Sequence, residues 1–204
     1  RMLSQTKWVM YQWDSDLVCN FHDKIKYFDC VKSFDPVDCQ KFKIELLPLF
    51  YLNKYEEFSL IPSFDIGYVG SYNHDRYSKL KLILTKLEKN GLSYRIHFYI
   101  SVFDYIKNKI LGHNISLKHI SFSKLSREDY VRLMSQSKAI LDLENIKQTG
   151  LTMRTIETLA SGRLLVTTNP SISMFSEKIK NYILLDPNLI TNSDMMSIKS
   201  YNSH

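Results

Sequence analysis

The segment from Gln148 to Thr168 brings together residue types that can bind an anion. Gly150 lets the backbone approach a ligand closely, and the first free N–H groups of a helix beginning near it suit phosphate oxygens. Arg154, about one turn further on, adds a guanidinium that can bind two phosphate oxygens at once. Glu157 follows on the same helix face and suits a pair of sugar hydroxyls. A helix docked on a sheet with a surface Arg–Glu pair explains the same residues, and this segment alone does not decide between the two.

A second candidate loop follows a predicted strand at 65–69. Gly70 and Ser71 would form its turn, and Arg76 would supply a positive charge. In a parallel sheet the loops that follow the strands gather at one edge, where ligands bind. The Gly70 loop and the Gly150 loop would therefore lie together and form a cradle for a diphosphate.

Strands and helices alternate along the chain in two series. Asp35 before Pro36 predicts the start of a helix that runs to Phe42, and Ser126 with Asp129 predicts the start of another. Further helices are expected at 75–89, in the stretch that follows the strand at 94–102 and runs to residue 110, and from about 150 to 162. Extended segments are expected at 8–11, 29–34, 46–51, 65–69, 94–102, 116–122, 139–143, 164–166 and 182–185. The repeated strand–helix–strand units predict an α/β fold with a Rossmann-like, doubly wound parallel sheet.

Composition limits the class of protein without choosing its ligand. The chain has 204 residues, of which 44% are hydrophobic and 24% charged, as is ordinary for a soluble globular protein. No apolar run approaches the ~18 residues that span a bilayer, and we expect a cytoplasmic protein. The net charge of +6 suits nucleic acid, an anionic membrane surface or a phosphorylated small ligand. The three cysteines are widely spaced and predict neither disulfides nor a zinc site.

Other titratable residues give weaker signals. The histidines show no metal-ligand spacing, and a bound metal is not expected. Asp142 and Glu144 would point to opposite faces of a strand that continued through them, so a paired acid–base role is not expected. No catalytic residue can be assigned from the sequence.

Several segments together resemble one family. DIGYVGSYNHDR at 65–76, HISFSKLSREDYVRLMSQSKAILDLE at 119–144 and QTGLTMRTIETLASGRLLVTTN at 148–169 are similar to the donor-binding domain of GT-B glycosyltransferases. Among these enzymes, the segments resemble in particular the bacterial polysaccharide and lipopolysaccharide biosynthesis group (glycosyl transferases group 1) related to CgeB-like proteins. YQWDS at 11–15 and YFDCVKSFDPVDCQKFKIELLPLFY at 27–51 resemble the end of the amino-terminal domain of the same group.

The resemblance implies roles for particular residues. Glu157 would hold the donor ribose, and Arg76 would be a basic ligand of the diphosphate. Thr149 stands where many retaining relatives carry a glutamate, so that sugar contact is either missing or supplied by Gln148. Gly150, Leu151 and Thr152 would face the diphosphate, and the loop around Phe122 and Ser123 would lie beside the nucleobase. Together with Gly70, Ser71 and Arg154 of the two loops, these residues complete the predicted donor site.

The resemblance also divides the chain. Residues 1–52 would be the carboxyl-terminal part of a shortened amino-terminal, acceptor-side domain, residues 53–64 a linker, residues 65–190 the donor-binding domain, and residues 191–204 a polar, frayed tail. The acceptor domain would normally hold much of the acceptor site and often the catalytic base, so a fragment without turnover is one interpretation.

The functional hypothesis is a metal-independent glycosyltransferase without a cofactor. It would transfer a sugar from a nucleotide-diphosphate donor, of the UDP or GDP type, to a growing bacterial surface glycan such as lipopolysaccharide, O-antigen or capsule. The acceptor would be lipid-linked or an oligosaccharide, with peripheral contact at the anionic inner face of the cell membrane. The alternative is a non-catalytic nucleotide-sugar-binding or assembly module. A basic RNA-binding or membrane-surface module is a third, weaker alternative, and nucleic acid is not the expected partner.

Overall fold

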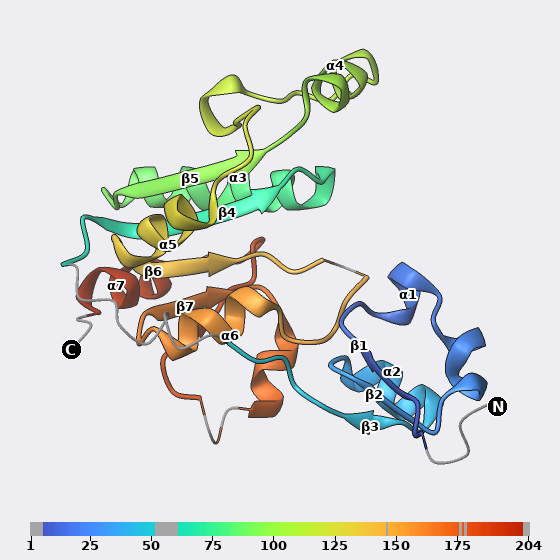
Figure 1. Ribbon diagram of the computed structural model, residues 1–204. Helices are drawn as coiled ribbons and strands as arrows, with labels where there is room; N and C mark the ends of the chain where they lie inside the picture. The colour runs from blue at the N-terminus through green and yellow to red at the C-terminus, as the bar shows by residue number, and fades with distance from the viewer. Residues whose placement is uncertain (1–5, 52–60, 146, 176, 178, 202–204) are drawn as a thin grey trace.

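Two parallel sheets form the framework of the protein. The computed structural model describes residues 6–51, 61–145, 147–175, 177 and 179–201. A three-stranded sheet has the order β1-β2-β3 and belongs to residues 6–51, which we call the small lobe; a five-stranded sheet has the order β5-β4-β6-β7-β8 and belongs to residues 61–201, the large domain. Figure 1 shows the small lobe beside the carboxyl ends of the strands of the larger sheet. The predicted α/β class with a Rossmann-like parallel sheet is confirmed.

The small lobe is built from short elements. Its helix α2 begins as predicted: the Asp35 side chain accepts hydrogen bonds from the backbone N–H groups of Val37 and Asp38, and Pro36 occupies the first turn. Lys43, with φ of 54°, ends the helix. The elements are β1 (Val9–Gln12), α1 (Asp16–Cys19), the 3-10 helix η1 (His22–Tyr27), β2 (Cys30–Ser33), α2 (Pro36–Phe42) and β3 (Glu45–Leu46).

The large domain alternates strands and helices. Its chain passes from β4 to β5 at one edge and then returns to add β6 on the other side of β4. This reversal leaves a crevice at the carboxyl ends of the strands, which is where doubly wound sheets bind ligands. The elements are β4 (Phe64–Ser71), α3 (His74–Lys89), β5 (Tyr94–Tyr99), α4 (Val102–Ile110), η3 (Leu117–His119), α5 (Arg127–Ser135), β6 (Ser137–Asp142), α6 (Met153–Ala160), β7 (Leu164–Thr167), η4 (Pro170–Phe175), β8 (Tyr182–Leu184) and α7 (Asn192–Ser200).

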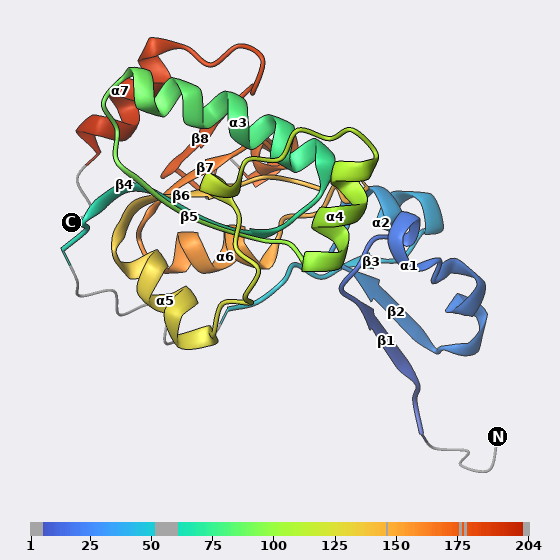
Figure 2. The same cartoon turned by 90° about the horizontal axis from the view of Figure 1, so that it is seen from above.

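Helices cover both faces of the five-stranded sheet. Figure 2 shows α3 and α7 on one face and α5 and α6 on the other. Side chains along β6 alternate accordingly: Ala139 and Leu141 belong to the core beneath α3 and α7, whereas Ile140 packs with Met134 of α5. Because the central strands are buried from both sides, their inner parts are apolar on both faces, as at residues 139–141 in β6 and 164–166 in β7. The same burial holds the loops at their carboxyl ends in place.

Four expectations about elements are wrong. Residues 116–122 do not form a strand, because Ser116 caps the 3-10 turn η3, and only an isolated bridge joins Ser121 to Tyr99. The extended run expected at 46–51 is limited to β3. Gly70 and Ser71 belong to β4 and not to a loop.

The fourth wrong expectation is the frayed tail. Residues 192–200 form α7, which begins with a capping box between Thr191 and Asp194. Met195 and Ile198 of α7 are buried against the sheet, and this apolar burial stabilises the helix on the domain. The linker predicted at 53–64 lies mainly outside the described residues, and the domain boundaries stay a prediction.

Candidate functional site

An open pocket of about 820 Å³ lies at the carboxyl ends of β4 and β5. It therefore occupies the position that the strand order predicts for a ligand. The end of β4 supplies Gly70 and Ser71, the first turn of α3 supplies Arg76, and α6 supplies Arg154 and Glu157. These five predicted residues do come together. The remaining lining residues are Val69, His97, Tyr99, Lys124, Leu125, Ser126, Arg127, Tyr130 and Met153.

Positive charge dominates the pocket. Four cationic side chains line it, and Glu157 is its single carboxylate: the cations are Arg76, Lys124, Arg127 and Arg154. Within the described residues, Arg154 alone of the four pairs with a carboxylate. The Nε–H of Arg76 instead donates a weak bond of 3.5 Å to the Glu144 carbonyl. An anion entering the pocket would meet three cations that no carboxylate neutralises.

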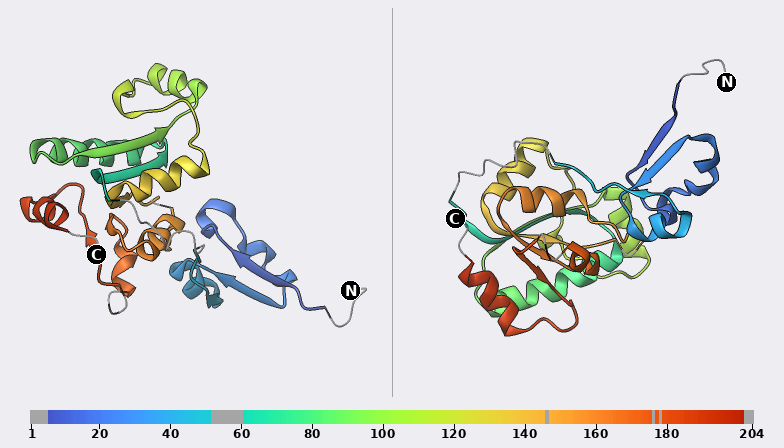
Figure 3. Two further views of the ribbon diagram at one scale, coloured as in Figure 1. Left: turned by 60° about the vertical axis from the view of Figure 1, so that its left-hand side comes forward. Right: turned by 90° about the horizontal axis from the view of Figure 1, so that it is seen from below.

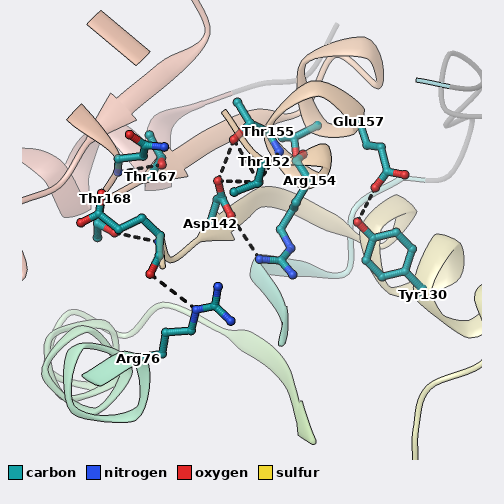
Figure 4. A network of polar contacts seen from close by, with 12 residues as sticks. Arg76, Tyr130, Asp142, Thr152, Arg154, Thr155, Glu157, Thr167 and Thr168 are labelled. Atoms are coloured by element: carbon teal, nitrogen blue, oxygen red, sulfur yellow. Dashed lines mark hydrogen bonds and ion pairs between the residues drawn. The ribbon is translucent and has the colours of Figure 1, made fainter. Parts of the chain in front are cut away.

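A buried carboxylate fixes the position of Arg154. Asp142, at the end of β6, is 0% exposed and accepts hydrogen bonds from Thr152 Oγ1 at 3.0 Å, Thr155 Oγ1 at 2.6 Å and Arg154 NH1 at 3.1 Å. Figure 4 shows this network. Burial acts to lower the pKa of Arg154, but the charge of Asp142 together with the contributions of Tyr68 and Tyr130 outweighs it, and the net shift of that pKa is upward. The guanidinium is held charged and oriented before any ligand binds.

Two buried polar groups next to the pocket have no protein partner. The Nε–H of Arg154 and the hydroxyl of Tyr68 make no hydrogen bond among the described residues. The Arg154 guanidinium carbon lies 5.4 Å from the Tyr68 ring centroid, a cation–π contact. A Cβ added to Gly70 would lie 2.4 Å from the Tyr68 hydroxyl oxygen, so glycine is required there. Unpaired donors beside a cationic pocket favour an anionic ligand.

Glu157 is the acidic counterpart in the pocket. It is 8% exposed, and its Oε2 accepts a hydrogen bond of 2.6 Å from the Tyr130 hydroxyl of α5. Figure 4 shows the two side chains facing each other. Among the described residues Oε1 accepts no hydrogen bond. A carboxylate held at one oxygen in this way can accept hydrogen bonds from sugar hydroxyls at its other oxygen.

The Gly150 loop lies against the small lobe and away from the pocket. The N–H of Gly150 donates to Asp35 Oδ2 at 3.3 Å, and a Cβ at Gly150 would lie 2.9 Å from the Phe34 carbonyl oxygen. Leu151 is buried in the core beneath α6. The helix begins only at Met153, with Thr152 as its N-cap. The helix therefore does not open at Gly150, and Asp35 already binds the Gly150 N–H. The roles expected for Gly150, Leu151 and Thr152 in facing the diphosphate stay predictions.

Three other predicted residues lie outside the pocket lining. Phe122 packs edge-on against Tyr105, and the Ser123 carbonyl accepts from His97 Nε2 at 3.0 Å. Gln148 Nε2 donates to Asp14 Oδ1 of the small lobe at 3.1 Å. The pocket is lined instead by the segment that follows Ser123, from 124 to 127. Their proposed roles in donor binding stay predictions.

Sequence reasoning missed several residues of the site. Lys124 and Arg127 lie on either side of the predicted N-cap Ser126, and this basic pair at the start of a predicted helix was the available signal. The only sequence clue to Asp142 was that it is a polar residue near the end of a predicted buried strand. No local pattern pointed to Tyr130, because its partner Glu157 lies on another helix.

Comparisons with known proteins support the fold. No family model matches the chain, and no curated protein matches it. Among the described residues there is no helix long and apolar enough to cross a membrane, and no cluster of three or more metal-ligating side chains. Among solved structures, the crystal structure of TarM matches with a TM-score of 0.58 and 15% identity over 90% of this chain. The chain spans 38% of the TarM chain, and the likeness shows that the two share a fold.

Proposed function

We propose that the large domain binds the nucleoside-diphosphate-sugar donor of a glycosyltransferase. The observation that carries the proposal is the pocket at the strand reversal, which is lined by four cationic side chains and the single carboxylate of Glu157. A nucleoside diphosphate needs both features, because its phosphates are anionic and its ribose presents two neighbouring hydroxyls. TarM, which shares the fold, is a glycosyltransferase. The resemblance of residues 65–169 to donor-binding domains points the same way.

The pocket suggests how the donor would be held. Arg154, fixed by Asp142, and Arg76 would bind the diphosphate, with Lys124 and Arg127 adding positive charge. Glu157 would accept from the ribose hydroxyls while Tyr130 keeps its carboxylate oriented. Cleavage of the sugar–phosphate bond leaves negative charge on the departing diphosphate, and preorganised arginines stabilise that charge as it develops. We propose a metal-independent reaction on this basis.

The acceptor is the finer part of the proposal. We propose a lipid-linked or oligosaccharide acceptor belonging to a bacterial surface glycan, because the sequence resembles the polysaccharide and lipopolysaccharide group. The donor would be of the UDP or GDP type. The acceptor would approach from the side of the small lobe, which stands beside the carboxyl ends of the strands (Figure 1).

Calorimetric titration with UDP, GDP and their common sugars tests donor binding. Glu157→Gln keeps the shape of the side chain but removes its charge. It should weaken binding about tenfold or more, since hydrogen bonds to charged groups contribute roughly 1.5–3 kcal/mol. Arg127→Gln should also weaken binding and should reduce its dependence on salt. Arg132→Gln, on the same helix but outside this pocket, is the matched control and should leave binding unchanged.

The same titrations separate the alternative functions. Equal binding by wild type and Glu157→Gln would contradict the assignment of the ribose site. Selective binding without release of nucleoside diphosphate from the donor, with or without oligosaccharide acceptors, would identify a non-catalytic nucleotide-sugar-binding module. Salt-dependent binding to RNA with no preference for nucleotide sugars would overturn the proposal.

A further inference from the structure

Helix α4 presents an apolar face that the described residues of the chain leave uncovered. None of its nine residues, Val102–Ile110, is buried. Phe103 is 76% exposed and Ile110 is 81% exposed, and with Ile106 they border a shallow hollow of about 270 Å³ that also includes Leu111. Figure 1 shows α4 projecting from the end of β5 at the margin of the domain. Apolar side chains gathered in this way on one exposed helix mark an interaction surface.

The opposite side of α4 attaches it to the domain. Tyr105 packs against Phe122 with ring centroids 5.4 Å apart, and Ser101 caps the helix by accepting from the Asp104 N–H. Because Tyr105 is turned toward the domain, the apolar side chains of α4 are directed outward. The helix is thus held in place while its apolar face is left to contact a partner.

The spacing of residues places charge on both sides of this apolar face. At 3.6 residues per turn, four exposed apolar side chains fall within an arc of about 100°: they are Val102, Phe103, Ile106 and Ile110. Lys109 lies about 20° beyond one edge of the arc and Lys107 about 40° beyond the other. The acidic residue of the helix, Asp104, lies on the far side of the helix and accepts from the Ser101 hydroxyl.

An apolar arc flanked by lysines on both sides is the pattern of a helix that lies in the interface of an anionic bilayer. The apolar side chains enter the acyl boundary while the lysines reach the phosphates of the headgroups. We infer that α4 docks the protein on an anionic membrane surface. The net charge of +6 also favours an anionic surface.

Docking through α4 would bring the pocket close to the bilayer. The helix follows β5 directly, and the last residue of β5, Tyr99, lines the pocket. The strands of the sheet end at the side from which α4 projects (Figures 1 and 3). A lipid-linked acceptor could then reach the pocket without leaving the membrane. This last step rests on the proposed function, whereas membrane docking itself does not.

Vesicle flotation without nucleotide tests the docking alone. The protein should float with vesicles of phosphatidylcholine containing 30% phosphatidylglycerol and remain largely unbound with phosphatidylcholine alone. The double variant Lys107→Gln, Lys109→Gln should bind the anionic vesicles about thirtyfold more weakly, since each lysine contributes roughly 1 kcal/mol at such a surface. Phe103→Gln with Ile110→Gln should reduce binding at least tenfold.

Matched controls separate the helix from general surface properties. Leu189→Gln with Met196→Gln changes two exposed apolar residues elsewhere, and Lys86→Gln with Lys89→Gln changes two exposed lysines of α3. Both controls should bind like wild type. Equal binding by the α4 variants, or no binding of folded wild type to anionic vesicles, would overturn the inference. Concentration-dependent dimers in light scattering that Phe103→Gln abolishes would assign the surface to a second copy of the chain and also overturn it.

Discussion

The Asp35 carboxylate caps helix α2 of the small lobe and also binds the loop before α6. Its replacement by asparagine should keep the helix cap and break the contact with the loop. Oδ1 accepts from the N–H groups of Val37 and Asp38 and from the Thr149 hydroxyl. Oδ2 accepts from the Ser15 hydroxyl and from the N–H groups of Thr149, at 3.0 Å, and Gly150, at 3.3 Å. Asp35 is 2% exposed, so water cannot replace these bonds.

The loss of stability expected for Asp35→Asn follows from how the hydrogen bonds are shared between Oδ1 and Oδ2. Asparagine is a good N-cap, so its amide oxygen should keep the bonds to Val37 and Asp38. Its NH2 group would then face the N–H groups of Thr149 and Gly150, leaving two buried donors without an acceptor. Each unsatisfied group costs roughly 1–3 kcal/mol, and we expect a loss of about 2–5 kcal/mol in the free energy of unfolding.

The effect should depend on pH. Burial acts to raise the pKa of Asp35, but the hydrogen bonds from Ser15 and Thr149 outweigh it and place the pKa below its ordinary value. A depressed pKa contributes stability that is present above the unfolded value, about 3.9, and is lost as the pH falls through the folded value. The difference between wild type and Asp35→Asn should therefore be full at pH 7 and shrink below about pH 4.

Urea unfolding at pH 7 and pH 3.5 measures both effects. Asp129→Asn is the control, because Asp129 is half exposed and, among the described residues, its carboxylate accepts only from Ser126 and Arg132. It should change the free energy of unfolding by less than about 0.5 kcal/mol. A loss this small for Asp35→Asn, or a loss that grows as the pH falls, would refute the reasoning.

Three further predictions concern single positions. Gly150→Ala would place a Cβ 2.5 Å from the Phe34 ring and should destabilise the fold by about 1–3 kcal/mol in urea unfolding; an unchanged midpoint would show that the loop moves freely. Asp142→Ala leaves Arg154 without its partner and should cost about 3 kcal/mol by calorimetry and weaken UDP binding, whereas Asp142→Asn should cost less; equal stability would mean that the pair is not needed. Thr191→Ala removes the capping box of α7 and should lower Tm by about 2–4 °C, and an unchanged Tm would show that the cap adds nothing.

The sequence by itself determined the local structure around the site. Asp35 with Pro36 and Ser126 with Asp129 start helices where expected, because a cap depends only on residues within one turn. Apolar stretches located β4, β6 and β7, because the central part of a strand that is buried on both faces is apolar on both sides. The three-residue spacing of Arg154 and Glu157 placed both side chains in one pocket.

Only the tertiary structure decided which groups meet. Gly150 is separated from Asp35 by 115 positions, and no local pattern shows that a carboxylate in the small lobe binds the N–H expected to face a ligand. The partners of Arg154 and Glu157 are likewise side chains from other elements, Asp142 of β6 and Tyr130 of α5. Periodicity and capping describe one element at a time, whereas burial and charge pairing depend on how elements pack. That packing joins the small lobe to α6 and forms the pocket.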